Sequence, residues 1–500
     1  MSAAESPLAS GACRLVLTNT PGAAALACAL VRAYAGALGF TPRELDQIEL
    51  GVEEAVSNVV RHAFPPDEPN QFELTCRATP LGLELLLHDQ GLPFDPGRVP
   101  DFDPTAEGSA QGGLGMHLMR RVFDEVEYRN LGRGGKETRL VRHRELVPIG
   151  ERSAAATDAV ADEAAEPVDV IRLLDADDAL EVARLIHEAY GYSYPYEHIY
   201  FPERIAALNA SGELCSALAV TSSGRIAGHA ALVIDPTTPD RAELAIVVTR
   251  MAWRGQGVAQ RIGDFLIAHA RASGLRLLFT NAVTAHPYTQ QFMHQLGFRD
   301  TALLPGHAPS SLRFRRINEA LAQRESCIYA LRYLDERCRA ERHLALPAAR
   351  RELIEEIYAS LGIAVHGTPL DGSLAPPTGA CLIDTAIHAG LELAQLRLLR
   401  WGSDALEVLR ARLAQLRRER MAVIELQLPL AEAHTAAALA RIEALGFLFS
   451  GILPGVDAGD DRLVLDFIAD PGFDFDAPKI HSALGQRLRT QMREQALGNA

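Results

Sequence analysis

The 500-residue sequence has few cysteines, and no pattern that would pair them. Its seven cysteines lie far apart, their number is odd, and none of them forms a Cys-x-x-Cys motif. Disulfide frameworks belong to oxidising compartments and use closely spaced, even sets of cysteines, so we expect reduced thiols. Residues Met1–Ala12 also lack the basic segment and the apolar run of a secretory signal peptide. These absences predict a cytoplasmic protein.

Long apolar runs and an excess of positive charge are also missing. No uninterrupted apolar stretch approaches the ~18 residues that a membrane-spanning helix needs, so no membrane insertion is expected. The net charge is −15, and basic runs such as QLRRER at Gln415–Arg420 lie in helical patterns, where they are typical of solvated faces. The sequence therefore argues against a nucleic-acid-binding surface. With 48% hydrophobic and 23% charged residues, the composition is that of a globular protein.

The length predicts about three domains. The clearest boundary is the segment Gly150–Asp169, which is rich in alanine and acidic residues and poor in large apolar ones. Such a segment cannot bury enough surface to fold alone, which indicates a linker. We place the linker at 148–167 and predict domains at 1–147, 168–335 and 336–500.

An internal similarity indicates that the last two domains are related. LGFRDTALLPG (Leu296–Gly306) and LGFLFSGILPG (Leu445–Gly455) share LGF and LPG at the same spacing. Each follows an amphipathic helical pattern that is preceded by a strand-like run. A duplicated domain would explain the match. The alternative is chance similarity between two helix–turn–strand units.

Near the N-terminus, one helix carries polar residues on an otherwise apolar pattern. Thr41 predicts the N-cap, Pro42 the first helical position, and Glu44 completes a capping box. Glu54 and Asn58 are four residues apart and project from one face of this helix. They form either a solvated surface pair or part of a binding site. The helical spacing is marked by Ile48, Val52, Ala55, Val56, Val59 and Ala63.

Two later segments have features suited to a nucleotide. A predicted strand at Leu81–His88 ends in Asp89 and Gly91, where the carboxylate could accept a hydrogen bond from an adenine amine and the glycine permits close approach of the base. A helix then begins after a glycine-rich turn, whose free N–H groups and positive dipole suit phosphates. The turn contains Gly112, Gly113 and Gly115.

The pieces EEAVSNVVRHAF, HDQGLPFDP, GGLGMHLMRRVFDEVEY and GGKETRLVR, in this order, resemble the anti-sigma-factor serine kinase branch of the histidine-kinase-type ATPases. The resemblance covers about the first 145 residues. It implies an α/β sandwich, with a mixed sheet under a helix layer, that binds Mg-ATP. It also implies a partner, a small antagonist protein of the STAS type or a sigma factor, and a homodimer formed through this domain.

The same resemblance implies roles for individual residues. Glu54 would be the general base for a substrate serine, and Asn58 would hold Mg²⁺. Asp89 would bind the adenine, next to Gly91. Thr138, within GGKETRLVR, would also line the nucleotide site. The phosphates would lie against Gly112, Gly113 and Gly115.

A second glycine-rich turn follows the predicted strand Ala242–Val248. It does not have the G-x-G-x-x-G spacing of a dinucleotide fold. The sequence R-G-Q-G-V-A and its flanking strands instead resemble the GNAT acyl-CoA N-acyltransferases over about 168–335. The resemblance implies that the backbone of Val247 and Val248 pairs with the pantetheine arm of acetyl-CoA. The pyrophosphate would be wrapped by Arg254, Gly255, Gln256, Gly257, Val258 and Ala259.

The sequence identifies the catalytic residues for acetyl transfer less completely than it identifies the acyl-CoA turn. Glu243 lies on the strand where this family often keeps a general base, and the alternative is a structural carboxylate. Met293 occupies the position at which the family usually has a tyrosine acid. Tyr288, a little over one turn upstream, could substitute for it or pack in the core. The domain therefore uses a different acid, or it binds acyl-CoA without turnover.

The third domain lacks the acyl-CoA loop. Where R-G-Q-G-V-A would occur, the chain has RWGSDALEVLRARL at Arg400–Leu413, with a single glycine. We expect a degenerate GNAT-like domain with a structural, pairing or substrate-recognition role.

The sequence as a whole predicts an α/β (α+β) multidomain protein: a histidine-kinase-like sandwich followed by two GNAT-like mixed-sheet domains. The expected function is a serine/threonine protein kinase fused to an N-acetyltransferase that acts on a protein or small-molecule amine. Its cofactors would be ATP, Mg²⁺ and acetyl-CoA. The alternatives are an ATP sensor that gates acetylation without kinase turnover, and a scaffold that binds both nucleotides without catalysis.

Overall fold

The computed structural model describes residues 12–65, 69–79, 81–92, 114–131, 134–144, 166–191, 194, 196–310, 321–367, 374–388 and 391–498. The chain forms two compact units. The first comprises Met1–Glu145 with Pro377–Ile424, and the second comprises Leu146–Pro376 with Glu425–Ala500. The predicted 1–147 domain thus shares its unit with a segment of the predicted third domain.

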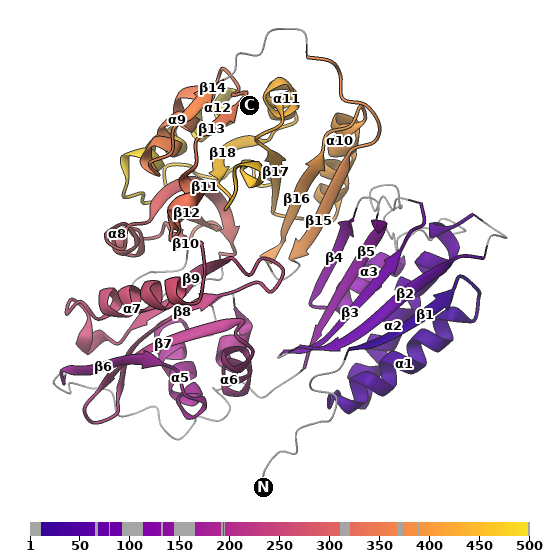
Figure 1. Cartoon of the computed structure of the whole chain (residues 1–500), viewed down its shortest axis with the longest axis horizontal. Coiled ribbons are helices and arrows are strands. Elements are labelled where there is room, and N and C mark those ends of the chain that lie inside the picture. Colours follow the sequence, from indigo (N-terminus) through magenta and orange to yellow (C-terminus); the bar gives the residue numbers. More distant parts are fainter. Residues whose placement is uncertain are drawn as a thin grey trace. The chain divides into compact units, whose positions relative to one another are not determined.

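In its described residues, the N-terminal part of the first unit has a five-stranded sheet and three α-helices. The strands pair in the order β1–β2–β3–β5–β4, and each of these pairings is antiparallel rather than mixed. The helices pack against the sheet (Figure 1). The elements are β1 (Cys13–Thr18), α1 (Ala23–Ala37), α2 (Pro42–Asn58), the π-helical turn η1 (Val59–Ala63), β2 (Gln71–Ala78), β3 (Gly82–Asp89), α3 (Leu114–Val122), β4 (Glu125–Asn130) and β5 (Lys136–His143).

The alternation of side chains along the strands explains this sandwich. Leu85 and Leu87 on β3 are buried, and so are the residues opposite them on β2, Cys76 and Leu74. On the other face of the sheet, the carboxylate of Glu84 pairs with arginines of the neighbouring strands. Because residues two apart on a strand share a face, one face of the sheet is apolar and must be covered by helices.

The start of α2 confirms the predicted capping box. The N–H of Thr41 donates to Glu44 Oε2 at 2.7 Å, and the N–H of Glu44 donates to the Thr41 hydroxyl at 3.4 Å. The apolar stripe of this helix is buried, as its spacing predicts. The sequence did not predict the end of the helix, where α2 passes into the π-helical turn η1 after Asn58.

The first unit continues with a segment from far along the chain. β15 (Leu382–His388) pairs antiparallel with β4, with Thr385 opposite Tyr128 and Ile387 opposite Val126. β16 (Leu393–Arg400) pairs with β15, and α10 (Ala405–Arg418) follows. The edge of the N-terminal sheet is therefore extended by residues that the sequence assigned to the third domain.

The second unit contains the predicted middle domain, which is built on a mixed sheet. β6, β7, β8 and β9 pair antiparallel in that order, β9 pairs parallel with β10, and β10 and β11 each pair antiparallel with β12. The elements are β6 (Val168–Leu173), η4 (Ala176–Asp178), α5 (Ala179–Tyr190), η5 (Glu197–Tyr200), α6 (Pro202–Ser211), β7 (Leu214–Thr221), β8 (Ile226–Val233), β9 (Arg241–Thr249), η6 (Met251–Trp253), α7 (Val258–Ala272), β10 (Leu277–Val283), α8 (Tyr288–Gln295), β11 (Arg299–Ala308) and β12 (Glu325–Tyr333).

Part of the rest of the second unit continues this sheet, whereas β13 and β14 pair parallel in a separate two-stranded sheet. β11 meets β18 at Ala302 and Gly451, and Gly451 has a φ of 136° in a position where a Cβ would overlap the backbone of β11. The further elements are η7 (Glu336–Arg339), β13 (Arg342–Leu344), α9 (Arg351–Ser360), β14 (Val365–Gly367), β17 (Val423–Pro429), α11 (Ala433–Glu443), β18 (Leu448–Leu453), η9 (Ala458–Asp460), β19 (Arg462–Ile468) and α12 (Ala483–Gly498).

The two LGF…LPG segments adopt the same local form. The first lies between α8 and the end of β11, and the second between α11 and the residues just after β18. Each is a helix–turn–strand unit, as the repeat predicts, while the duplication itself stays a prediction. All seven cysteines are free. Among the described helices, none has both the length and the apolarity to cross a bilayer.

Candidate functional sites

The predicted kinase base lies against the start of α3. Glu54 is partly exposed on α2, and its Oε2 is so close to the backbone of Gly115 that a Cβ at that position would overlap it. Gly115 is the second residue of α3, where backbone N–H groups have no partner within the helix. Two residues distant in sequence thus meet where the glycine-rich turn enters α3. Gly112 and Gly113 lie outside the described residues.

Asn58 is the last residue of α2, one turn beyond Glu54 and partly exposed. The π-helical turn that follows packs on the end of β3. The N–H of Leu92 donates to the carbonyl of Ala63 at 2.6 Å, and a Cβ on Gly91 would overlap the same carbonyl. The close contact with Ala63 therefore requires a glycine at position 91, whether or not a nucleotide base also approaches it. Insertions of this π-helical kind are frequent at functional sites.

Asp89 is 4% exposed at the end of β3. Its Oδ1 accepts a hydrogen bond of 2.9 Å from the N–H of Gly91 and lies 3.1 Å from Lys136 Nζ. Thr138 on β5 is opposite Leu87, so it shares the helix-covered face of the sheet with Asp89. Sequence analysis missed Lys136, which is two residues before Thr138 on the same strand.

These residues fit a nucleotide. Asp89 is a buried carboxylate at the end of a strand, Gly115 leaves room for the Glu54 carboxylate near the start of α3, and a carboxylate and an amide stand one turn apart on α2. The backbone at the start of α3 suits an anion, and the amide and carboxylate oxygens suit Mg²⁺.

The second glycine turn has the conformation that an anion site needs. Gly255 and Gly257 have φ angles of 75° and 73°, a region that other residues rarely adopt. Gly257 is the N-cap of α7 and provides no side-chain cap. A Cβ on either glycine would meet no atom within 4 Å, so the space in front of the helix start is open. This arrangement fits the pyrophosphate of an acyl-CoA.

The other predicted residues of this turn contribute mainly backbone. Arg254 Nε donates to the Thr249 carbonyl at 3.3 Å, and the Gln256 side chain donates to the Ala252 carbonyl at 2.9 Å. Val258 is buried and Ala259 is half-buried in the first turn of α7. The side chains of Arg254 and Gln256 therefore form hydrogen bonds within their own loop. The turn would contact a ligand mainly through its main-chain groups.

The two central strands of the middle domain diverge beside this turn. The parallel β9–β10 register runs from Arg241 opposite Leu277 to Glu243 opposite Phe279, and it stops there. The remaining part of β10 stays paired with β12. Glu243 therefore stands where the two strands begin to separate.

A bulge in β9 follows three residues later. Ile246 has a φ of 54°, which is uncommon for a β-branched residue and points to a functional position. Its N–H donates to the Tyr194 hydroxyl at 3.2 Å, and its carbonyl lies 2.9 Å from His229 Nδ1. Val248 is opposite His229 in the β8–β9 ladder, whereas Val247 lies in the register shift.

Glu243 is enclosed by two polar side chains. Its Oε2 accepts a hydrogen bond of 2.6 Å from the Tyr196 hydroxyl, and its Oε1 accepts one of 2.9 Å from Asn281 Nδ2. Burial raises the pKa of Glu243 above its ordinary value, although both hydrogen bonds act to lower it. Burial and the adjacent Glu243 also raise the pKa of Tyr196 well above that of a free tyrosine, so Tyr196 keeps its proton.

Sequence analysis did not identify Tyr196 or Asn281. Both partners reach Glu243 only through the fold, although the tyrosine-rich run YGYSYPYEHIYF does signal the segment. Tyr288, the predicted substitute acid, is 66% exposed, whereas Met293 is buried. The core-packing alternative for Tyr288 is therefore wrong, and its role as an acid stays a prediction.

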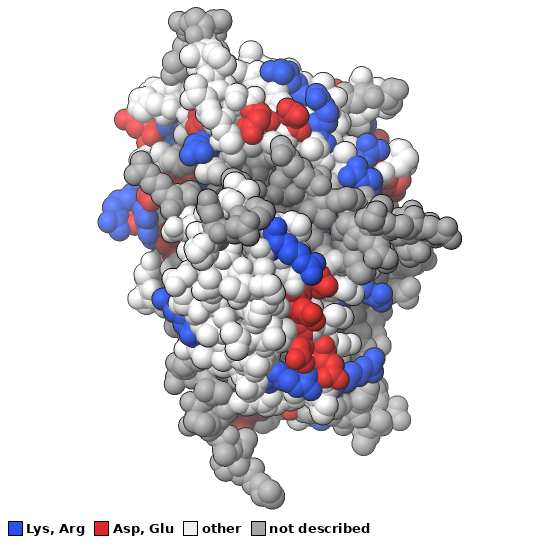
Figure 2. Space-filling view, turned by 90° about the vertical axis from the view of Figure 1, so that its right-hand side faces the viewer, with Lys and Arg blue, Asp and Glu red and all other residues white. Residues whose placement is uncertain are grey.

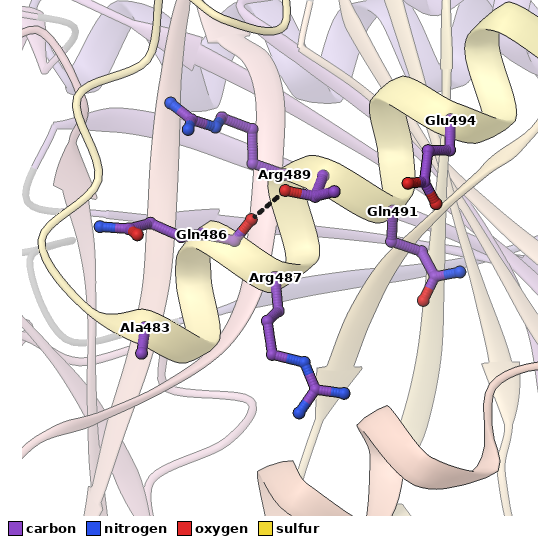
Figure 3. Close-up of a pocket in the computed structure, with 7 residues that line it drawn as sticks. Ala483, Gln486, Arg487, Arg489, Gln491 and Glu494 are labelled. Atoms are coloured by element: carbon purple, nitrogen blue, oxygen red, sulfur yellow. Dashed lines mark hydrogen bonds between the residues drawn. The ribbon is translucent and has the colours of Figure 1, made fainter.

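A hollow on the surface of α12 does not coincide with either site. Within it, Thr490 donates a hydrogen bond of 2.9 Å to the Gln486 carbonyl, and its arginines project from the helix (Figure 3). No residue predicted from the sequence lies in it, and we assign it no function. It is lined by Ala483, Gln486, Arg487, Arg489, Thr490, Gln491 and Glu494.

On the face of the molecule that Figure 2 shows, acidic and basic side chains are interspersed among uncharged residues. Much of the visible described surface carries no charge. This face of the molecule therefore carries charges of both signs.

Comparison with known proteins assigns both domains. Residues 17–142 match the histidine kinase-like ATPase domain model, and residues 180–298 match the acetyltransferase (GNAT) family model. The chain contains a histidine kinase-like ATPase domain and a GNAT acetyltransferase domain. The degenerate GNAT-like third domain stays a prediction.

Among curated proteins, the ATPase domain is similar to serine-protein kinases. It is 30% identical over 102 residues to serine-protein kinase RsbW of Bacillus subtilis (strain 168), which is 19% of this chain and 64% of that protein. It is 32% identical over 83 residues to serine/threonine-protein kinase BtrW of Bordetella bronchiseptica, which is 16% of this chain and 58% of that protein. The chain thus spans less than two thirds of the length of these relatives.

Among solved structures, the chain is similar to N-acetyltransferases. The ribosomal-protein-S18-alanine N-acetyltransferase of Escherichia coli is 16% identical with a TM-score of 0.27, and the match covers 33% of this chain and 94% of that one. The phosphinothricin acetyltransferase of Sinorhizobium meliloti, solved with acetyl-CoA, is 20% identical with a TM-score of 0.28, and the match covers 34% of this chain and 90% of that one.

Proposed function

We propose that this chain is a transferase with two activities: an ATP-dependent protein serine kinase joined to an acetyl-CoA-dependent N-acetyltransferase, acting in the cytoplasm. The observation that carries the kinase half is the position of Glu54 against Gly115, at the start of the helix that would face the phosphates. The enclosed carboxylate of Glu243, where β9 and β10 diverge, carries the acetyltransferase half.

In the kinase half, this chain supplies positioning and a base. Asp89 would bind the adenine, and Asn58 would hold Mg²⁺. The main chain at Gly112, Gly113 and Gly115 would hold the phosphates. Glu54 would accept the proton of the substrate serine. ATP supplies the phosphoryl group, whose transfer depends mainly on positioning and charge neutralisation.

The kinase substrate in this proposal is a small STAS-type antagonist protein, and a sigma factor is the second protein partner. The resemblance to anti-sigma-type kinases supports both partners, as does the similarity to RsbW. We further propose that the chain forms a homodimer through its ATPase domain. β1 is the edge of the sheet that no described strand of this unit covers, whereas β4 is covered by β15.

In the acetyltransferase half, Glu243 would remove a proton from the acceptor amine. Its raised pKa makes it a stronger base than an exposed carboxylate. The turn from Arg254 to Ala259 would hold the pyrophosphate of acetyl-CoA, and Val247 and Val248 would pair with its pantetheine arm. Acetyl-CoA supplies the acetyl group. The acceptor in this proposal is a protein or small-molecule amine.

A second candidate function, an ATP sensor that gates acetylation without phosphorylating a protein, is favoured by one contact. Arg120, on the helix that follows the glycine turn, forms an ion pair with Glu419, at the end of α10. The side chains of Arg120 and Glu419 are only 16% and 12% exposed. Occupancy of the nucleotide site could therefore influence α10 without phosphoryl transfer.

Glu54→Gln, assayed with labelled ATP and candidate antagonist proteins, tests the kinase half. We expect the variant to bind ATP and to lose phosphoryl transfer. Glu53→Gln is the matched control, because Glu53 is an exposed neighbour on the same helix. Equal phosphorylation by the wild type and Glu54→Gln would refute the kinase assignment. Acetylation that responds to ATP in Glu54→Gln would favour the sensor.

Gly257→Glu, followed by titration with acetyl-CoA, tests the acetyltransferase half. A negative side chain in front of α7 should abolish measurable binding. Gly274→Glu is the control, because Gly274 also has a positive φ, of 82°, and also faces open space, but follows the other end of α7. Unchanged acetyl-CoA affinity in Gly257→Glu would exclude this turn as the binding site.

A further inference from the structure

Three potential metal ligands from three strands converge within the second unit. His307 of β11 places its Nε2 2.9 Å from Asp466 Oδ1 of β19 and 3.8 Å from Glu425 Oε2 of β17. The ligating atoms of these residues all lie within 4.8 Å of one another. Neither the ATP site nor the acyl-CoA turn uses any of them.

The second oxygen of each carboxylate is held by a further side chain. The Ser450 hydroxyl donates to Asp466 Oδ2 at 2.5 Å, and Gln427 Nε2 donates to Glu425 Oε1 at 2.6 Å. The oxygens nearer to His307 are thereby oriented toward its Nε2. Metal sites characteristically have such outer hydrogen bonds, which fix the orientation of the ligands.

Burial makes this arrangement costly unless positive charge lies between the two carboxylates. Asp466 is completely buried, Glu425 is 2% exposed, and the His307 side chain is 10% exposed. Two carboxylates therefore face one imidazole nitrogen where water cannot screen their repulsion. Arg324 is a further charged group that acts on His307, and its Nε donates to the Gly306 carbonyl at 2.8 Å.

We propose that His307, Glu425 and Asp466 form a binding site for a divalent transition-metal ion of the Zn²⁺ or Mn²⁺ kind. Bonds of about 2.1 Å to nitrogen and oxygen place neighbouring ligands about 3.0–3.4 Å apart, and the separations of 2.9 and 3.8 Å from His307 Nε2 bracket that range. Imidazole disfavours Ca²⁺ and Mg²⁺, which prefer sets of oxygen ligands.

The ion would have a structural role. β11 belongs to the acetyltransferase domain, whereas β17 and β19 come from the C-terminal part of the chain. β11 and β18 share one register pair, at Ala302 and Gly451. A metal bound by all three strands would add a strong link beside this short contact, within one unit.

The test is metal content of the full-length protein. The chain is stripped with a chelator, loaded separately with Zn²⁺ and Mn²⁺, desalted and analysed by mass spectrometry for ions per chain. We expect one ion per chain in the wild type and its loss in His307→Ala and Asp466→Asn. Ser450→Ala keeps all three ligands and should weaken binding about 10- to 100-fold.

Asp300→Asn is the matched control. Asp300 also pairs with a histidine, His294, at 2.7 Å, but among the residues that the structure describes no second carboxylate joins that pair in a three-ligand cluster. The metal content of Asp300→Asn should equal that of the wild type. No retained ion in the wild type would overturn the proposal, leaving His307 as a buried ion-pair partner. One retained ion per chain in both His307→Ala and Asp466→Asn would also overturn the proposal.

Discussion

The hydroxyl of Tyr196 donates a 2.6 Å hydrogen bond to the carboxylate of Glu243, the proposed base for acetyl transfer. Burial raises the pKa of Glu243, and this bond partly offsets the rise because it stabilises the charged form. Tyr196 therefore lowers the pH below which the base becomes protonated, together with Asn281, and it acts through Glu243 as a positioning residue.

Tyr196→Phe should move the acid limb of acetyl transfer to higher pH. Without the hydroxyl, the pKa of Glu243 rises further, so the base is lost at a pH where the wild type still has it. A hydrogen bond to a charged group contributes about 1.5–3 kcal/mol, which corresponds to a shift of about one to two pH units. The measurement is kcat/KM against pH. Tyr333→Phe is the control, because it removes a tyrosine hydrogen bond elsewhere, to the Gly455 carbonyl. If the acid limbs of Tyr196→Phe and the wild type coincide, the role of Tyr196 is contradicted.

Gly115→Ala should impair phosphoryl transfer and leave the ATPase domain folded. Alanine favours a helix over glycine by about 1 kcal/mol, so α3 itself should not weaken. The new methyl group would overlap the Glu54 carboxylate, which must move. We expect a loss of at least about tenfold in phosphorylation rate, since misplacement by about 1 Å can cost a hundredfold.

Gly36→Ala supplies the control for this substitution. Gly36 lies within α1, and a Cβ there would make only an ordinary contact, 3.9 Å from Leu45. Its phosphorylation rate should equal that of the wild type. If Gly115→Ala is as active as Gly36→Ala, Glu54 has no catalytic role in its observed position.

Asp461→Asn should strongly destabilise the second unit. Asp461 Oδ2 accepts hydrogen bonds of 2.7 Å from Arg342 Nε and 2.6 Å from the Tyr358 hydroxyl, and both members of the ion pair are almost completely buried. Breaking a buried pair leaves an uncompensated charge and costs about 3–5 kcal/mol. Urea unfolding measures the loss. Glu352→Gln, which alters an exposed pair with Arg487, should leave the midpoint unchanged.

Glu419→Gln should weaken ATP binding from outside the nucleotide site. Arg120 would lose its charged partner, and α3 would no longer be held to the end of α10. Coupling through such contacts amounts to about 0.5–2 kcal/mol, which is about two- to thirtyfold in affinity. Titration with ATP measures it. Glu407→Gln, on an exposed position of α10, is the control; equal affinities in the two variants would exclude this coupling.

Local patterns predicted much of each site. The capping box at Thr41 placed α2, and with it the spacing of Glu54 and Asn58. The strand predicted at Leu81–His88 ended one residue before Asp89, which is the last residue of β3. The glycines of the acyl-CoA turn preceded α7. In each case neighbouring residues decide the outcome, because helix periodicity, caps and positive φ angles are properties of short segments.

Other features had no local signal. Lys136 lies at Asp89 because β3 and β5 are paired, and Tyr196 reaches Glu243 across 47 residues of sequence. The pairing of β4 with β15 joins segments that the sequence assigned to different domains. No periodicity could indicate these contacts, because each depends on which strand edges meet.

The sequence by itself determined the family of each recognised domain and the helix starts that would hold two nucleotides, since those features are written in short, contiguous motifs. Only the tertiary structure decided which side chains surround Glu243, and it alone brought His307 to Asp466 from 159 residues away. Side chains from separate strands become neighbours through sheet register, and register is set by the packing of the whole unit.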